Sequence, residues 1–158
     1  MIRAMLFCLA LTLATPLAAQ EVADMTPRDG WNVIATPQSF DALVEAVRGN
    51  AKTAGLAVVT MAGPTGAAAA RGIEIPGNRV IGLYNNDFAV RVLRLSTHAM
   101  IEAPIRMYVT ENGDGTATLS WKRPSTVFAP YMSDAPGLEA VAVELDAAFA
   151  AVADAAVE

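Results

Sequence analysis

The sequence predicts an α+β fold, a two-layer sandwich in which one mixed or antiparallel sheet carries helices on one face. Strand-like and helix-like segments follow one another in the order β-α-β-β-α-β-β-α. The sixth and seventh elements are joined by a short polar turn, as in an antiparallel hairpin. The helices are spread among the strands, and 158 residues are enough for one domain with a buried core.

Residues 1–19 are predicted to be a secretory signal peptide. Arg3 gives a positive start, residues 4–14 form a short apolar stretch, and residues 15–20 end in small side chains. We expect cleavage after Ala19 or, as the alternative, one residue earlier. The apolar stretch is short for a membrane span, which disfavours an uncleaved anchor, and no second stretch of spanning length follows. We therefore expect an exported protein, periplasmic in a Gram-negative bacterium and otherwise secreted, with no membrane span in the mature chain.

Composition limits the chemistry of the mature protein. The one cysteine, Cys8, lies in the predicted signal peptide, so no disulfide, thiolate metal ligand or thiol nucleophile is expected afterwards. The formal net charge of −5 becomes −6 when Arg3 is removed, and no Lys or Arg follows Arg123. Such an acidic surface argues against nucleic acid and anionic membranes as partners.

Residues 20–30 are polar and predict a flexible lead-in to a single domain over residues 31–157. The domain is expected to begin with a strand at 31–35. One face of this strand holds Trp31, Val33 and Ala35.

The next segment is predicted to be a helix, because apolar residues recur at spacings of three and four. They are Phe40, Leu43, Val44, Val47, Ala51 and Ala54. Thr36 or Ser39 can cap the start of this helix, and Gly55 ends it.

Two apolar segments follow and are predicted to be buried strands. Residues 56–61 are continuously apolar and rich in β-branched side chains, which is typical of a strand buried on both sides. Residues 62–72 contain a turn with room for one helical turn. Residues 79–85 form the second strand, where Gly82 marks a bulge or a close backbone approach.

Residues 87–96 are predicted to be a helix, although many of their side chains also favour a strand. Asp87 is well placed as the N-cap. Phe88, Val92 and Leu95 fit one helix face.

The last third of the domain contains the predicted hairpin, with strands at 104–110 and 116–122 around a turn at 111–115. Ile105, Met107 and Val109 share a face with Ala117, Leu119 and Trp121, while Arg106, Tyr108, Thr118 and Ser120 take the other face. A short helix is expected within residues 125–132. The final helix is expected at 136–156, with Ser133 or Asp134 as its cap.

The best-placed candidate site lies where the strand at 79–85 ends. Asn85, Asn86 and Asp87 follow this strand, and Arg91 comes one turn into the next helix. Free backbone N–H groups at a helix start attract anions. Glu102 and Arg106 flank the start of the neighbouring strand, so a small polar ligand would bind in a pocket where the two groups meet. The alternative is that these residues only cap a helix and cover its surface with solvated charges.

The sequence contains no motif for a metal site, a Ser/His active site or a phosphate-binding loop. His98 is the one histidine, which excludes a histidine-based metal cluster, and a Ser96–His98 active site is disfavoured because both residues lie on one loop. No phosphate-binding glycine loop is present, and we expect no metal, no cofactor and no catalytic set.

Several motifs resemble the DUF302 family, a domain of unknown function with the TT1751-like fold, over roughly residues 31–152. Ser39-Phe40 and Gly55-Leu56 match its helix start and its helix–strand junction. Tyr84–Asp87 stands where members commonly have Phe-Gly-Asn-Pro, so Asn86 alone matches there. Ala103-Pro104 stands for Leu-Pro, and Trp121–Pro124 for the aromatic-x-x-Pro motif. The resemblance implies an α+β fold and a tendency to form homodimers, without an established reaction.

One departure from the family concerns a histidine. Many members have an Asp-His pair after the second strand, where this chain has MAGPTG at residues 61–66. The resemblance therefore gives no ground to expect an activity that depends on this histidine here.

Three functional hypotheses follow. The first is an exported small-ligand-binding or accessory protein, as a homodimer. The second is an enzyme that acts on a small polar substrate through Asp87 or Glu102 with Arg91 or Arg106. The third is an interaction module whose acidic C-terminal helix docks a basic partner.

Overall fold

A computed structural model describes residues 22–158 of the chain. The predicted signal peptide and the first two residues of the lead-in therefore lie outside the described residues. Residues 22–30 lead into the first strand, and within them the Asp24 carboxylate accepts a hydrogen bond of 2.9 Å from the Gly113 N–H.

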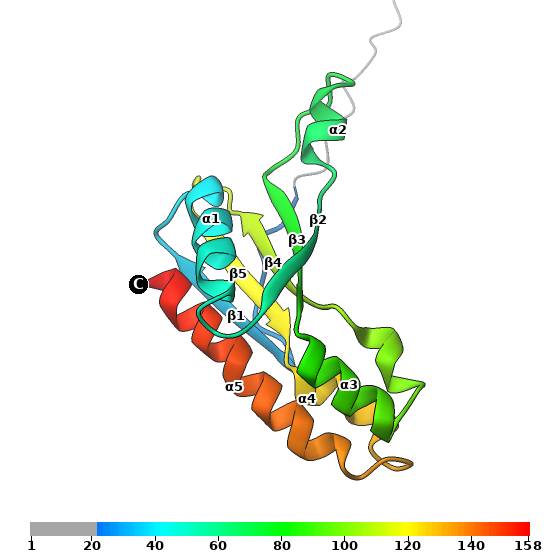
Figure 1. Cartoon of the computed structure of the whole chain (residues 1–158). Coiled ribbons are helices and arrows are strands. Elements are labelled where there is room, and N and C mark those ends of the chain that lie inside the picture. Colours follow the sequence, from blue (N-terminus) through cyan, green and yellow to red (C-terminus); the bar gives the residue numbers. More distant parts are fainter. Residues whose placement is uncertain (1–21) are drawn as a thin grey trace, which may run out of the picture.

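A five-stranded antiparallel sheet forms one layer of the molecule (Figure 1). Its strands lie in the order β1-β5-β4-β3-β2, and every neighbouring pair is antiparallel. Their bounds are β1 (Trp31–Thr36), β2 (Ala57–Ala62), β3 (Asn78–Tyr84), β4 (Ile105–Glu111) and β5 (Ala117–Lys122). The structure confirms the predicted α+β fold.

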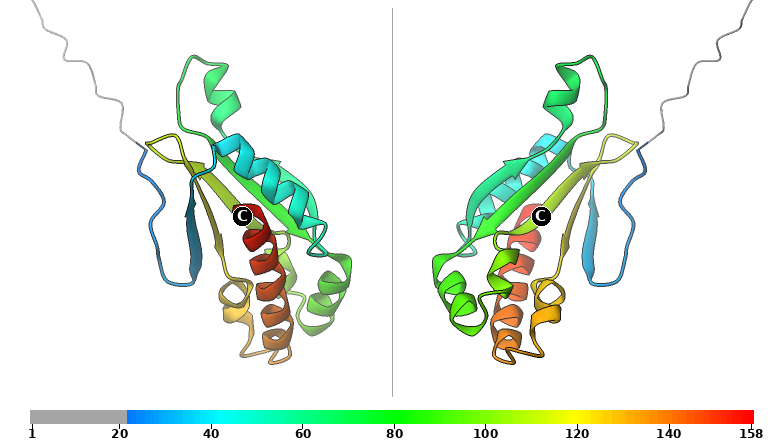
Figure 2. Two further views of the ribbon diagram at one scale, coloured as in Figure 1. Left: turned by 90° about the vertical axis from the view of Figure 1, so that its left-hand side faces the viewer. Right: turned by 90° about the vertical axis from the view of Figure 1, so that its right-hand side faces the viewer.

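Helices form the second layer, and Figure 2 shows α1 and α5 on the same side of the sheet. The long helices are α1 (Phe40–Ala51), α3 (Asn86–Leu95) and α5 (Leu138–Val157). Shorter ones are α2 (Thr65–Ala69), α4 (Pro124–Phe128) and the 3₁₀ helices η1 (Ala99–Glu102) and η2 (Ala129–Tyr131). We call the side of the sheet away from α1 and α5 the open face.

The core lies between the sheet and the two helices α1 and α5. Its fully buried side chains include Leu43 and Val47 from α1, Phe149 from α5, and Met107 and Leu119 from the sheet. Met107 pairs with Trp121 and Val109 with Leu119, which confirms the predicted faces of the hairpin. Burial of these large apolar side chains is the main source of stability for a chain of this kind.

Strand β1 turns the predicted Trp31–Val33–Ala35 face away from the core. Trp31 lies opposite Lys122, and Val33 lies opposite Ser120, both on the open face. The core side of β1 carries Ile34, together with Thr36, whose hydroxyl donates a 2.9 Å hydrogen bond to a backbone carbonyl of β5.

The expectation that residues 56–61 form a strand buried on both sides is wrong. β2 is the terminal strand of the sheet, and five of its six residues are exposed. The physical reason is position, because α1 and α5 cover the strands next to it and no further strand of residues 22–158 flanks its outer edge. Beyond the body of the molecule, β2 and β3 continue into an arm that carries α2 at its tip (Figure 1).

Two predicted helix caps are also wrong. Helix α3 begins one residue earlier than expected, with Asn85 in the extended conformation as its N-cap instead of Asp87. Helix α5 begins at Leu138 after Gly137, without a side-chain cap from Ser133 or Asp134. Ser39 does cap α1, where its hydroxyl accepts the Ala42 N–H.

Candidate functional site

Asn85 joins three parts of the backbone at the end of β3. Its Oδ1 accepts hydrogen bonds from the N–H groups of Asp87 at 2.7 Å and Phe88 at 3.1 Å. Its Nδ2 donates to the Gly55 carbonyl at 2.8 Å, in the turn between α1 and β2. The amide is thus occupied by the protein itself, as the capping interpretation requires. Its neighbours Asn86 and Asp87 are exposed on the first turn of α3.

Arg91 is bound to the C-terminal helix. Its guanidinium makes two hydrogen bonds of 2.6 Å to the Glu144 carboxylate, and it lies 5.4 Å from the Phe88 ring centre. The hydrogen bond from Arg91 lowers the pKa of Glu144, and the same bond raises the pKa of Arg91. Arg91 therefore links α3 to α5, and its charge is already compensated.

Glu102 and Arg106 lie apart from these residues. The space between the two predicted groups is a small apolar cavity of about 30 Å³ that Asn85, Phe88, Ala103 and Ile105 help to line. This volume is far below that of a metabolite site. The six predicted residues are thus divided: Asn85 and Asn86 line one depression, Glu102 and Arg106 line another, and Asp87 and Arg91 line neither.

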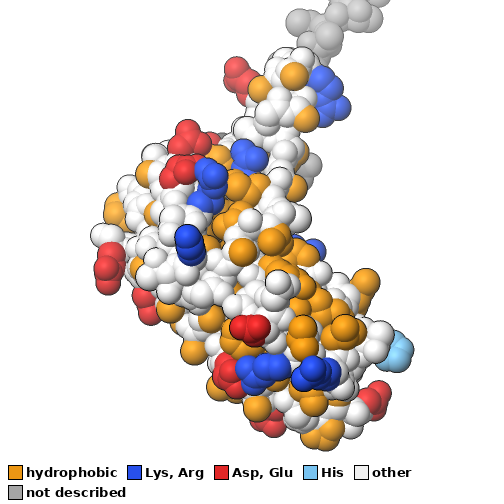
Figure 3. Space-filling view, in the orientation of Figure 1, with side chains coloured by type: hydrophobic (Ala, Val, Ile, Leu, Met, Phe, Trp, Pro, Cys, Tyr) orange, Lys and Arg blue, Asp and Glu red, His pale blue; other side chains and the backbone are white. Residues whose placement is uncertain are grey.

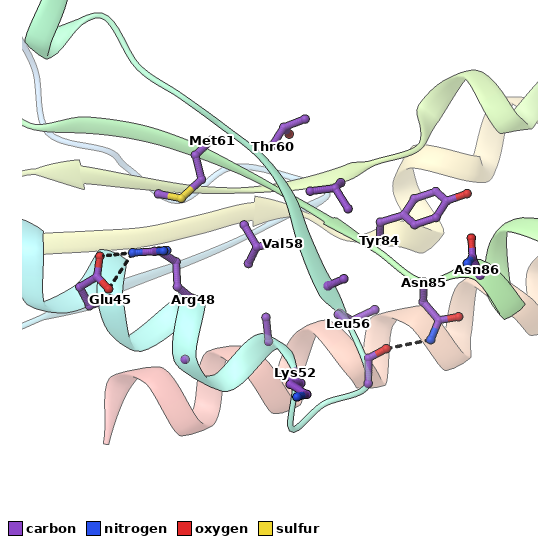
Figure 4. Close-up of a pocket in the computed structure, with 15 residues that line it drawn as sticks. Glu45, Arg48, Lys52, Leu56, Val58, Thr60, Met61, Tyr84, Asn85 and Asn86 are labelled. Carbon is purple, nitrogen blue, oxygen red and sulfur yellow. Dashed lines mark hydrogen bonds and ion pairs between the residues drawn. The ribbon is translucent and has the colours of Figure 1, made fainter.

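The first depression, which we call the edge groove, runs between α1 and β2 and is shown in Figure 4. It has a volume of about 1200 Å³ and is wide open to solvent. Val58 and Met61 of β2 point toward α1, whose Glu45 and Arg48 form an ion pair of 2.6 Å at the rim. In Figure 3 apolar side chains cover the surface along this part of the molecule. The groove is long, shallow and apolar, as a surface for another protein segment would be.

The second depression, which we call the open-face pocket, has a volume of about 390 Å³. This volume lies in the usual range of small-molecule sites. Residues from β1, β3, β4, β5, η1 and α4 line it: Trp31, Asn78, Val80, Glu102, Ile105, Arg106, Tyr108, Trp121, Lys122 and Val127. Val80 lies directly opposite Tyr108 in the β3–β4 ladder, so the pocket extends over the side of the sheet that the helices leave uncovered.

Two cations of the open-face pocket come from neighbouring strands. Met107 pairs with Trp121, so Arg106 just before the former lies beside Lys122 just after the latter. Among residues 22–158, no carboxylate lies within ion-pair distance of either cation. The Lys122 ammonium lies 5.5 Å from the Trp31 ring centre, a cation–π distance.

The polar groups of the pocket are held in place by the protein. Glu102 accepts a 2.7 Å hydrogen bond from the Tyr131 hydroxyl, and this bond raises the pKa of Tyr131. The Asn78 amide donates to the Tyr108 hydroxyl. Trp121 is only 2% exposed, yet its indole N–H has no partner among the described residues. A buried donor without an acceptor is uncommon in folded proteins.

Part of this pocket was predictable from the sequence. Glu102 and Arg106 were candidate site residues, and Tyr108 was predicted to lie on the same strand face as Arg106. The sequence did not connect Trp31 with Lys122, because the pairing of β1 with β5 joins segments about ninety residues apart. The alternation of side chains along β1 and β5 was the available signal.

The residues that the structure describes give little support to metal binding or to catalysis. Residues 22–158 contain no group of three or more His, Cys, Asp or Glu side chains arranged to hold a metal ion. His98 is exposed. Of the residue pairs that the enzymatic hypothesis names, only Glu102 and Arg106 share a pocket. No helix within the same range is long and apolar enough to cross a membrane.

Comparison with known proteins gives a family and a fold. Residues 32–156 match the family model described as domain of unknown function DUF302. A crystal structure of an uncharacterized conserved DUF302 protein from Bacillus stearothermophilus superposes with a TM-score of 0.72 at 17% identity, covering 83% of this chain and 100% of that one. At this identity the likeness shows the fold alone. No curated protein matches the chain.

Proposed function

This chain belongs to the DUF302 family, whose function is unknown, and from this premise we propose that it is an exported protein that binds a small organic anion in the open-face pocket. The observation that carries the proposal is the pair of neighbouring cations, Arg106 and Lys122, in a pocket of metabolite size. Both lack a carboxylate partner within residues 22–158.

The charge of the pocket differs from that of the chain. The chain carries a net charge of −5, whereas the pocket lining has two cations and one carboxylate, Glu102. This carboxylate is engaged by the Tyr131 hydroxyl. A positive pocket on an acidic protein attracts small anions locally. A guanidinium and an ammonium side by side suit a carboxylate or phosphate group, which Arg can bind with two parallel hydrogen bonds.

The rest of the lining favours a ligand that also has an apolar or planar part. Trp31, Tyr108, Val80 and Val127 supply aromatic and aliphatic surface beside the two cations. Inorganic phosphate or sulfate would leave this surface in water, whereas an aromatic or branched acid would cover it. The Glu102 carboxylate is available to a ligand that brings a hydrogen-bond donor, since the Tyr131 hydroxyl binds only one of its two oxygens.

The other two hypotheses receive less support. Of the residue pairs in the enzymatic hypothesis, only Glu102 with Arg106 remains a candidate, since Arg91 is paired with Glu144. The interaction hypothesis relied on the acidic residues of the last helix. Two of these residues already have partners within the fold, because Glu144 binds Arg91 and Asp146 accepts the Ser125 N–H at 2.9 Å.

Thermal-shift measurements with four ligand groups test the proposal: aromatic carboxylates, aliphatic carboxylates, inorganic phosphate and sulfate, and neutral aromatic compounds. A ligand that binds only the folded protein raises the unfolding midpoint. At a concentration 100 times Kd it adds about 2.7 kcal/mol to the free energy of unfolding. We expect organic acids to raise it and the inorganic anions and neutral compounds to have little effect.

Matched variants locate the binding. Arg106→Gln and Lys122→Gln should each raise the Kd of the organic acids about tenfold or more, because each substitution removes one cation from the pocket. Arg94→Gln removes an exposed cation on α3, away from the pocket, and should change nothing. The proposal fails if no organic acid raises the midpoint, or if the Arg106 and Lys122 variants respond like the wild type.

A further inference from the structure

We infer that the ligand of the open-face pocket is a linear aliphatic carboxylic acid whose tail lies in a second depression farther along β4. This inference rests on the proposed function, and it adds the shape of the ligand and its orientation. The second depression, which we call the tail pocket, has a volume of about 400 Å³. Its walls are residues 22–25 of the lead-in, residues 64 and 75–77 of the arm, Asn78 of β3, and Tyr108, Thr110 and Glu111 of β4.

The two pockets adjoin on the open face of the sheet. Asn78 and Tyr108 line both of them, and the Asn78 amide donates a hydrogen bond to the Tyr108 hydroxyl at their boundary. Arg106 of the open-face pocket and Thr110 of the tail pocket lie on the same side of β4, because side chains alternate along a strand. Asn78 and Tyr108 are only half-buried, so a ligand can pass over them from one pocket to the other.

Charge differs between the two pockets. The open-face pocket contains the cations Arg106 and Lys122, whereas none of the described residues that line the tail pocket is Lys or Arg. The tail pocket contains two carboxylates. Asp24 accepts a backbone N–H of the β4–β5 turn at 2.9 Å, and Glu111 accepts one from the base of the arm at 2.6 Å. The acid group of a ligand is thus attracted to the open-face pocket and repelled from the tail pocket, which fixes the orientation of the ligand.

The tail pocket also offers apolar surface for the tail. This surface comes from the lead-in, the arm and the sheet, and it includes Met25, Ile75, Pro76 and the ring of Tyr108. Figure 2 shows the start of the lead-in beside the turn between β4 and β5, where the hydrogen bond to Asp24 holds it. Such a surface binds methylene groups because binding removes them from water.

The spacing along β4 gives the length of the ligand. Arg106 and Thr110 are four residues apart, which corresponds to about 13 Å at about 3.3 Å per residue. A fully extended polypeptide advances roughly 3.5 Å over three bonds, so about eleven bonds of an extended chain span this distance. A straight-chain acid of about twelve carbons therefore reaches from the two cations into the tail pocket, whereas a short acid fills the open-face pocket alone.

Isothermal titration calorimetry of the mature protein with straight-chain acids of about four to fourteen carbons, below their micelle concentrations, tests the inference. Kd should fall about two- to fourfold for each added methylene up to about twelve carbons and then level off, because each buried methylene is removed from water. The dicarboxylic acid of the same length should bind about tenfold more weakly than the monoacid, because its second carboxylate would lie beside Asp24 and Glu111.

Two isoleucines of the arm provide matched variants. Ile75→Asp places a carboxylate in the tail pocket, so long acids should bind this variant no better than short ones, and the Kd of short acids should stay unchanged. Ile73→Asp is the control, since Ile73 is 49% exposed and lines neither pocket. This variant should show the same dependence on chain length as the wild type. If Ile75→Asp does not fold, the acid series on the wild type decides the inference alone.

Three results would overturn the inference: a Kd that does not depend on chain length, a dicarboxylic acid that binds as tightly as the monoacid, or a folded Ile75→Asp protein that still favours long acids. If short acids bind and longer ones bind no better, the inference fails while the proposed function stands. If no organic acid binds at all, both fail.

Discussion

Asn85 shows how one side chain can decide a local structure. It accepts two backbone N–H groups at the start of α3 and donates to the Gly55 carbonyl, so it fixes the turn after α1 relative to the turn after β3. We predict that Asn85→Ala lowers the free energy of unfolding by about 1–2 kcal/mol, because loss of an N-cap leaves helix donors unpaired. Urea unfolding followed by circular dichroism measures this change.

The neighbouring residue provides the control for this prediction. Asn86 is exposed, and no hydrogen bond of its side chain to residues 22–158 is present. Asn86→Ala should therefore change the stability by less than about 0.5 kcal/mol. Asn85→Asp should fall between the two, since it keeps the acceptor and loses the donor to Gly55. Equal losses for the two alanine variants would contradict the capping role.

The Arg91–Glu144 pair makes a prediction about pH. The hydrogen bond from Arg91 lowers the pKa of Glu144 below its ordinary value of 4.5 in the folded protein. The pair therefore adds stability above that value, and the stability is lost as the pH falls through the lowered pKa. Thermal midpoints measured from neutral to acidic pH should fall less steeply for Glu144→Gln than for the wild type.

The effect of this pair should be small and sensitive to salt, because both side chains are about half exposed. High salt should bring the wild-type profile toward that of the variant. Parallel profiles for the two proteins at low salt would show that the ion pair does not contribute to stability.

At the level of elements, Gly82 controls how closely β2, β3 and the start of β4 approach. A Cβ at this position would lie 2.2 Å from Thr60 Oγ1 and 3.0 Å from Pro104 Cγ. We predict that Gly82→Ala destabilises the protein by roughly 1–3 kcal/mol through overpacking. Chemical denaturation of Gly82→Ala, Thr60→Ala and the double variant measures how much of this cost arises at Thr60.

Gly49 is the matched glycine for this experiment. It lies within α1, and a Cβ there would meet no atom within 4 Å. Gly49→Ala should stabilise the protein by about 0.5–1 kcal/mol, because alanine favours the helix. If both alanine variants changed the stability in the same direction, crowding would not be the reason for glycine at position 82.

The elements also show what could be predicted from the sequence. The hairpin and its faces were predictable, because alternation over two strands and a Gly-Asp-Gly turn agree with each other. The N-cap of α3 was not, since Asn85 and Asp87 are both good caps and the local sequence does not choose between them. The exposure of β2 could not be predicted either, because its apolar composition is the same for a strand at the edge of a sheet as for one in the middle.

At the level of the whole molecule, the candidate site illustrates the same limit. Glu102 and Arg106 were found because they are four residues apart in the sequence. Trp31 and Lys122, which join them in the pocket, are about ninety residues apart in the sequence and meet because β1 pairs with β5. Local patterns determine each strand, whereas the pocket depends on the order of strands in the sheet, which only long-range packing decides.

Export is the last property of the whole chain that can be tested. The described elements begin with β1 at Trp31, so removal of residues 1–19 would take no strand or helix of the described domain. We predict that the full-length chain, produced in a Gram-negative bacterium, is recovered from the periplasm with Gln20 as its first residue, as measured by intact mass.

Two further outcomes separate the alternatives for this N-terminal segment. A chain that starts with Met followed by residues 20–158 should stay in the cytoplasm and bind organic acids as the exported protein does, because the pocket is made from Trp31 and residues that follow it. Recovery of the unprocessed chain in the membrane fraction would instead show that residues 1–19 act as an anchor. In that case the ligand proposal would stand, but the pocket would belong to a membrane-attached protein.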